Sequence, residues 1–134
     1  MRKVCSVLMA VAQKQIMIVE DNAPSMRLAT DLLEMNGFSV LQASTGVQAL
    51  EMLTTNTPDL ILLDIGLPDM SGFDIFNWVK GEKRLEPTKV VAFSASTNPE
   101  DQYRIGHLGF DASIPKPFST KDFSVTIKGL LQNN

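Results

Sequence analysis

Residues 60–64 read LILLD, four apolar residues followed by a carboxylate, and this stretch decides the fold of the chain. A strand that is apolar on both faces is typical of the centre of a parallel sheet that helices cover on both sides. The apolar run stops at Asp64, which would place this carboxylate at the carboxyl end of the strand. We therefore expect a buried parallel sheet with Asp64 where the strands end.

Four further strand candidates flank this stretch, at residues 16–19, 39–43, 90–93 and 112–115. Segments with apolar residues at helical spacing separate them. In the first such segment Leu28, Leu32 and Met35 recur at spacings of four and three, so we expect them to form one buried helix face. Five strands that alternate with five helices predict right-handed crossovers and an α/β fold.

The composition excludes several kinds of site. The chain has 134 residues, which suits one domain, and 15 acidic residues against 12 basic ones give a formal net charge of -3. This balance argues against direct nucleic-acid binding, which usually needs a basic face. One Cys and one His leave no internal disulfide, no zinc site of several thiolates and no site with two imidazoles.

Residues 1–14 form an N-terminal extension, disordered or packed on the domain, and the domain itself occupies residues 15–134. Arg2 and Lys3 precede an apolar run over residues 4–12, a pattern shared with signal peptides. The run is too short to span a bilayer as a helix, so we expect no membrane span. A signal peptide, a packed extension and a leader from an upstream start all remain open, and we expect a cytoplasmic protein.

Polar side chains follow four of the five predicted strands. Glu20 and Asp21 follow the first, Asp64 the third, Ser94 the fourth and Lys116 the fifth. In open α/β sheets, ligands bind at the carboxyl ends of the strands, near a switch in strand order. We therefore expect three carboxylates, one hydroxyl and one ammonium group to meet at that edge.

These groups suit one kind of chemistry. Three adjacent carboxylates repel one another, and a hard divalent cation such as Mg²⁺, which prefers oxygen ligands, relieves that repulsion. An ammonium group and a hydroxyl can both bind a phosphoryl group. A carboxylate beside Mg²⁺ can attack phosphorus and become an aspartyl phosphate. The residues alone thus predict a Mg²⁺-dependent phosphoaspartate site.

Four motifs in order resemble the receiver domain of two-component response regulators. They are residues 16–22 (IMIVEDN), 62–72 (LLDIGLPDMSG), 93–95 (FSA) and 116–118 (KPF). The resemblance runs from about Gln15 to Leu131. It implies a doubly wound, flavodoxin-like fold with five helices, in which a five-stranded parallel sheet has the order 2-1-3-4-5.

The resemblance also implies a role for each residue of the acidic cluster. Asp64 matches the phosphoacceptor. Glu20 and Asp21 match the acidic pair that holds Mg²⁺ together with Asp64, and the backbone carbonyl of Gly66 would be a further ligand.

The same resemblance assigns the phosphoryl-binding residues. Ser94 and Lys116 match the hydroxyl and ammonium groups that bind phosphoryl oxygens, and the bond between Lys116 and Pro117 is usually cis in this family. Gly66 and Ser96 match the positions that influence hydrolysis of the aspartyl phosphate.

One position departs from the family pattern. Ser113 stands where most receivers carry a Tyr or Phe that swings inward on activation. A serine cannot fill that pocket with a ring. We therefore expect the switch to depend on the loop after Ser94 and on the fourth helix, whose apolar period is poor. The alternative is that an aromatic side chain of a partner fills the pocket.

The function implied by the resemblance is signalling rather than substrate turnover. A sensor histidine kinase or a histidine phosphotransfer protein would supply the phosphoryl group, and the altered domain would then bind an unidentified downstream protein. The chain could also be a receiver domain from a hybrid histidine kinase or a multidomain regulator. A phosphorylation-independent binding module is a further alternative, as is a phosphatase of the haloacid-dehalogenase type, which would need a second Asp where this chain has Gly66.

Overall fold

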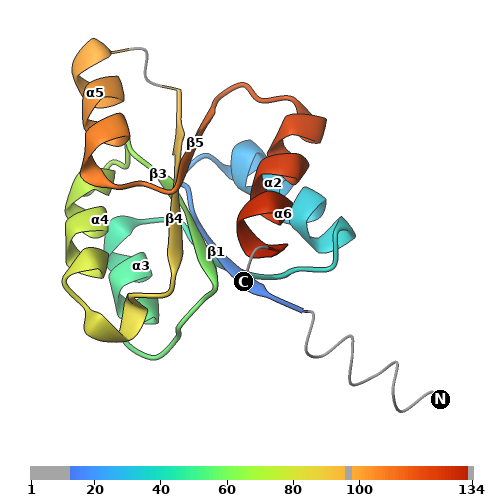
Figure 1. Cartoon of the computed structure of the whole chain (residues 1–134), viewed down its shortest axis with the longest axis horizontal. Helices are drawn as coiled ribbons and strands as arrows, with labels where there is room; N and C mark the ends of the chain where they lie inside the picture. Colours follow the sequence, from blue (N-terminus) through green and yellow to red (C-terminus); the bar gives the residue numbers. More distant parts are fainter. Residues whose placement is uncertain (1–12, 96–97, 133–134) are drawn as a thin grey trace.

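The computed structural model describes residues 13–95 and 98–132, and a parallel sheet of five strands forms its centre (Figure 1). The strands are β1 (Gln15–Val19), β2 (Ser39–Ala43), β3 (Leu60–Asp64), β4 (Lys89–Ser94) and β5 (Ala112–Pro115). Their order is β2-β1-β3-β4-β5 and all neighbours are parallel. The predicted fold class and strand order are confirmed. Of the predicted extension, only Gln13 and Lys14 lie within the described residues.

Helices cover both faces of the sheet (Figure 1). They are α2 (Ala23–Met35), α3 (Gly46–Leu53), α4 (Gly72–Lys80), α5 (Pro99–Leu108) and α6 (Thr120–Gln132), with a short 3₁₀ helix η1 (Lys83–Leu85) before β4. One apolar cluster joins α2 and α6 to one face of the sheet, and a second joins α3 and α4 to the other. Among the described residues, no helix has the length and apolar character that crossing a membrane requires.

The central strand β3 is buried along its whole length, as its sequence predicts. Its side chains alternate between the two faces of the sheet. Leu60 and Leu62 belong to the cluster under α2 and α6, whereas Ile61 and Leu63 belong to the cluster under α3 and α4. This period of two explains why every residue of the strand is apolar until Asp64, where the strand leaves the core.

The buried face of α2 differs from the prediction. Leu28 is 45% exposed and Met35 is 81% exposed, so these two residues do not belong to the core. The buried residues of this helix are Met26, Ala29 and Leu33. They also recur at spacings of three and four, so periodicity alone fits either face. Leu32 of the predicted face is partly buried and packs against this core.

The loop between β3 and α4 is fastened to the start of α3. The Asp69 carboxylate accepts hydrogen bonds from the backbone N–H groups of Gly46 and Val47, both at 2.9 Å. Gly46 has no side chain, and a Cβ there would lie 2.3 Å from Cγ of Met70. The loop that follows Asp64 is therefore held between two helix starts.

The first residue of α4 packs directly against the backbone of Asp64. A Cβ on Gly72 would lie 2.5 Å from the Asp64 carbonyl oxygen and 2.7 Å from Cα of Ile65. Overpacking of this kind costs about 1–3 kcal/mol, so we expect Gly72→Ala to lower the midpoint of thermal unfolding by several degrees.

Gly106 provides the matched control, because a Cβ there meets no atom within 4 Å in the interior of α5. Alanine is the better helix former, so Gly106→Ala should raise stability by up to about 1 kcal/mol. Differential scanning calorimetry of both variants checks the pair. A Gly72→Ala protein as stable as the wild type would contradict the close packing.

Candidate acidic site at the strand ends

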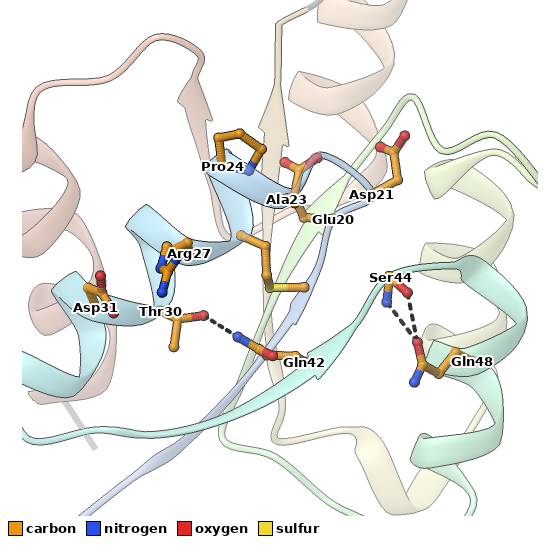
Figure 2. Close-up of a pocket in the computed structure, with 11 residues that line it drawn as sticks. Glu20, Asp21, Ala23, Pro24, Arg27, Thr30, Asp31, Gln42, Ser44 and Gln48 are labelled. Carbon is orange, nitrogen blue, oxygen red and sulfur yellow. Dashed lines mark hydrogen bonds between the residues drawn. The ribbon is translucent and has the colours of Figure 1, made fainter.

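Three carboxylates meet where β1 and β3 end. The register of these neighbouring strands pairs Val19 with Leu63, so the residues that follow, Glu20 and Asp64, leave the sheet side by side. Each of Glu20, Asp21 and Asp64 offers a carboxylate oxygen within 4.8 Å of the others. Glu20 is 1% exposed and Asp64 is 6% exposed, whereas Asp21 is open to solvent. Figure 2 shows Glu20 and Asp21 where the chain leaves β1 and turns into α2.

Lys116 supplies a positive charge to this cluster. Its Nζ lies 2.5 Å from Oε1 of Glu20 and 3.6 Å from Oδ2 of Asp64. The end of β5 carries the residue to this place, because the Lys116 N–H donates to the carbonyl of Ser94 at the end of β4. The bond between Lys116 and Pro117 is cis, in agreement with the expectation.

Backbone N–H groups hold the two buried carboxylates in position. The N–H of Gly66 donates to Oδ1 of Asp64, and the N–H of Asn22 donates to Oε2 of Glu20, both at 3.0 Å. Each carboxylate thus uses one oxygen for the protein backbone and turns the other toward Lys116. This arrangement fixes the carboxylates without neutralising them fully.

Burial of the Asp64 carboxyl raises its pKa from 3.8 to about 6. The hydrogen bond from Gly66 and the charge of Lys116 lower this pKa, while the charge of Glu20 raises it further. Desolvation dominates because the ionised form loses water that no single partner replaces. In the absence of a metal ion, the negative charge on Asp64 is therefore costly at neutral pH.

The donor set fits a hard divalent cation. Three carboxylates provide oxygen ligands, and Gly66, in the loop that follows Asp64, lines the same depression. One ammonium group faces three carboxylates, which leaves an excess of negative charge. A cation that prefers oxygen ligands and keeps several waters suits such an open, acidic cluster.

The structure brings most of the predicted residues to one depression. Asp64, Gly66, Ser94 and Lys116 line it together with the acidic pair, and it encloses about 740 Å³. Ser94 is buried at the end of β4. Ser113 is exposed on β5 and lines a separate depression against α6, so the structure does not bring it to the carboxylates. Ser96 lies outside the described residues.

The sequence alone did not identify the α5 side chains that line the same depression. Asp101 and Arg104 lie one turn apart on α5, and both line it together with Phe73 of α4. Their spacing of three places them on one helix face. That spacing was a usable signal, but only Ile105 of α5 is buried, so the apolar pattern did not orient this helix.

A second groove lies on the other side of the acidic pair, between α2, β2 and α3 (Figure 2). Its polar side chains bond to one another. Gln42 donates to the hydroxyl of Thr30 at 2.9 Å, and Oε1 of Gln48 accepts from the N–H of Ser44 at 2.8 Å. These hydrogen bonds join β2 and the residue after it to the neighbouring helices α2 and α3.

Comparison with known proteins gives consistent results. Residues 16–128 match the family model described as the response regulator receiver domain. The chain is 40% identical over 118 residues to the polar-differentiation response regulator DivK of Brucella ovis. The aligned region covers 88% of this chain and 96% of the relative.

Solved structures agree with that match. A signal receiver domain of a histidine kinase from Syntrophus aciditrophicus superposes with a TM-score of 0.83 and 29% identity, over 90% of this chain and 91% of that one. A CheY-like receiver domain protein from Methanospirillum hungatei gives a TM-score of 0.80 and 28% identity, over 91% and 96% of the two chains.

The raised pKa of Asp64 makes a prediction about stability without divalent cations. Between about pH 4 and pH 6, the folded protein binds more protons at Asp64 than the unfolded chain does, so the free energy of unfolding falls as pH rises through this window. Asp64→Asn removes that loss. We expect this variant to be more stable than the wild type at pH 7.5 by about 1–3 kcal/mol, measured by urea denaturation in EDTA.

Asp69→Asn is the control of opposite sign. Hydrogen bonds from the N–H groups of Gly46 and Val47 lower the pKa of Asp69, so its charge favours the folded state and the substitution should destabilise the protein. If Asp64→Asn lowered stability in EDTA as Asp69→Asn does, the account of the acidic cluster would be wrong.

Proposed function

The chain belongs to the response regulator receiver family, whose members are phosphoacceptor signalling modules rather than conventional enzymes, and we propose that Asp64 is its phosphoacceptor. One observation carries this assignment. Asp64 is a buried carboxylate that has another carboxylate, Glu20, and the ammonium group of Lys116 as neighbours, and Lys116 lies within 4 Å of both carboxylates. It has the charge partner and the open depression that an incoming phosphoryl group needs.

The proposed reaction is a transfer from phosphohistidine. A carboxylate oxygen of Asp64 attacks phosphorus, a new P–O bond forms, and the P–N bond to the donor imidazole breaks with its electron pair going to nitrogen. Because the other ring nitrogen of the phosphohistidine carries a proton, the ring leaves as a neutral imidazole. Lys116 binds a phosphoryl oxygen and Ser94 donates to another, so that the chain contributes mainly position and charge.

The acidic cluster is the proposed metal site. Glu20, Asp21 and Asp64, together with the Gly66 carbonyl, would hold Mg²⁺, because hard oxygen ligands and an excess of negative charge favour this ion. When bound, Mg²⁺ offsets the charge of the carboxylates and of the phosphoryl oxygens. The backbone bonds from Gly66 and Asn22 keep the carboxylates in place whether or not the ion is present.

Signalling would follow from the new charge. Phosphorylation adds negative charge and strong acceptor oxygens beside Ser94, and movement of this hydroxyl toward the phosphoryl group would shift the loop that leads to α5. Since Ser113 is small and lines another depression, beside α6, it supplies no aromatic ring for the β5 switch of other receivers. We assign the conformational change to the segment between β4 and α5.

The partners follow from the chemistry. The donor would be a sensor histidine kinase or a histidine phosphotransfer protein, and the acceptor of the signal a downstream protein. Kinases of this kind use ATP, which supports a cytoplasmic location. The haloacid-dehalogenase alternative is disfavoured, since Gly66 offers no second carboxylate at the position where such an enzyme needs its general acid.

Magnesium binding should be visible as a gain in stability. We expect millimolar MgCl₂ to raise the unfolding temperature of the wild type. An ion that binds only the folded state, present at a concentration 100 times its Kd, raises the free energy of unfolding by about 2.7 kcal/mol. Asp21→Asn should lose most of this gain. Asp31→Asn, which removes an exposed carboxylate from the neighbouring groove, should keep it. Equal responses of the two variants would refute the assigned ligands.

The phosphoacceptor can be tested with a small phosphodonor. Incubation with acetyl phosphate and Mg²⁺ should add the mass of one phosphoryl group to the wild type, and EDTA should prevent it. Asp64→Asn should gain no mass, whereas Asp74→Asn, which removes an exposed carboxylate at the start of α4, should react like the wild type. Intact-protein mass spectrometry checks all three. An Asp64→Asn protein that is modified as fully as the wild type would contradict the proposal.

A further inference from the structure

Arg104 is a second cation at the acidic depression. Among residues 13–95 and 98–132, the basic side chains that line this depression are those of Lys116 and Arg104. They come from different elements, Lys116 from the end of β5 and Arg104 from the second turn of α5. The receiver assignment uses only the first of them.

The two cations are held in different ways. Lys116 already contacts two carboxylates, Glu20 and Asp64. The guanidinium carbon of Arg104 instead lies 3.8 Å from the centre of the Phe73 ring. A cation on an aromatic face near solvent is held more weakly than one that is hydrogen-bonded to an anion. Arg104 is therefore the cation of this depression that can be redirected at low cost.

A phosphoryl group on Asp64 would change the balance of charge. Four lining carboxylates, Glu20, Asp21, Asp64 and Asp101, face two lining cations. Phosphorylation adds further negative charge and three strong acceptor oxygens. The planar guanidinium group matches such oxygens with two parallel hydrogen bonds, which an ammonium group cannot provide.

The helix that carries Arg104 is lightly attached to the core. In α5 only Ile105 is buried, and a Cβ added at Gly106 would meet no atom within 4 Å. Phe73, on which Arg104 lies, belongs to the same small apolar cluster as Ile105. A new bond from Arg104 to the phosphoryl group would thus pull on a helix that few apolar contacts oppose.

We infer that Arg104 is a phosphoryl-sensing residue of this protein: its guanidinium group leaves the Phe73 ring, binds the oxygens of phosphorylated Asp64 and so draws α5 toward the site. This inference rests on the proposed function. It gives the conformational change a route that does not require an aromatic residue at position 113. Ser94 at the end of β4 and Arg104 in the middle of α5 then both connect to the phosphoryl group.

Beryllofluoride, which with Mg²⁺ mimics the phosphoryl group on a carboxylate, tests the inference by titration calorimetry. We expect Arg104→Gln to bind beryllofluoride roughly tenfold more weakly than the wild type, the loss of one charge-assisted contact, and Arg104→Lys to lie between them. Binding of Mg²⁺ alone should be unchanged. Lys80→Gln is the matched control, since Lys80 lies 5.4 Å over the neighbouring Phe76 ring but does not line the depression.

Hydrogen exchange provides the second readout. With saturating beryllofluoride, amides of residues 100–108 should gain protection in the wild type and in Lys80→Gln but not in Arg104→Gln. Two results would overturn this inference while the proposed function stands, provided that the wild type binds beryllofluoride. One is an affinity of Arg104→Gln for beryllofluoride within twofold of that of the wild type. The other is a gain of protection in α5 of Arg104→Gln equal to that in the wild type. If the wild type itself fails to bind, both are overturned.

Discussion

The structure depends on one electrostatic constraint, which is that two buried carboxylates are held side by side at the ends of neighbouring parallel strands. The pairing of Val19 with Leu63 leaves no other place for Glu20 and Asp64. Their repulsion is tolerated because Lys116 and two backbone N–H groups hold them. Burial of the Asp64 carboxyl, and after it the charge of Glu20, raises its pKa, so the negative charge of this cluster remains costly without a cation.

The rest of the fold serves to keep that constraint in place. A sheet with apolar residues on both faces buries β3 entirely, so Asp64 cannot move along or out of its strand. Gly72 allows α4 to begin against the backbone of Asp64, and Asp69 ties the intervening loop to α3. The rigid part of the site lies on β1 and β3, whereas the part attached by few apolar contacts lies on α5. This division suits a protein that must bind a group firmly and then change shape.

Much of this arrangement could be predicted from the sequence, because parallel strands place the residues that follow them at one edge. Apolar strands that alternate with helical periods were sufficient for the α/β class, and the polar residues that follow the strands were sufficient for the acidic cluster. The strand order came from the resemblance to receiver domains. Two of the three residues predicted for the buried face of α2, Leu28 and Met35, are exposed, whereas Leu32 packs against the core. Leu28 and Met26 begin equally good helical periods, and only packing on the sheet distinguishes them. Arg104 was not predicted because α5 buries a single residue, and so weak an amphipathic pattern does not show which face of the helix points to the site.

The central claim is that Asp64, and no other carboxylate, becomes the acyl phosphate. Borohydride reduces an aspartyl phosphate to homoserine, so it records the modified position permanently. After transfer from a phosphorylated histidine phosphotransfer protein in the presence of Mg²⁺, reduction and peptide mapping should find homoserine at position 64 alone. Homoserine at Asp59, at the exposed Asp69 or Asp74, or at no position despite loss of phosphate from the donor, would contradict the account.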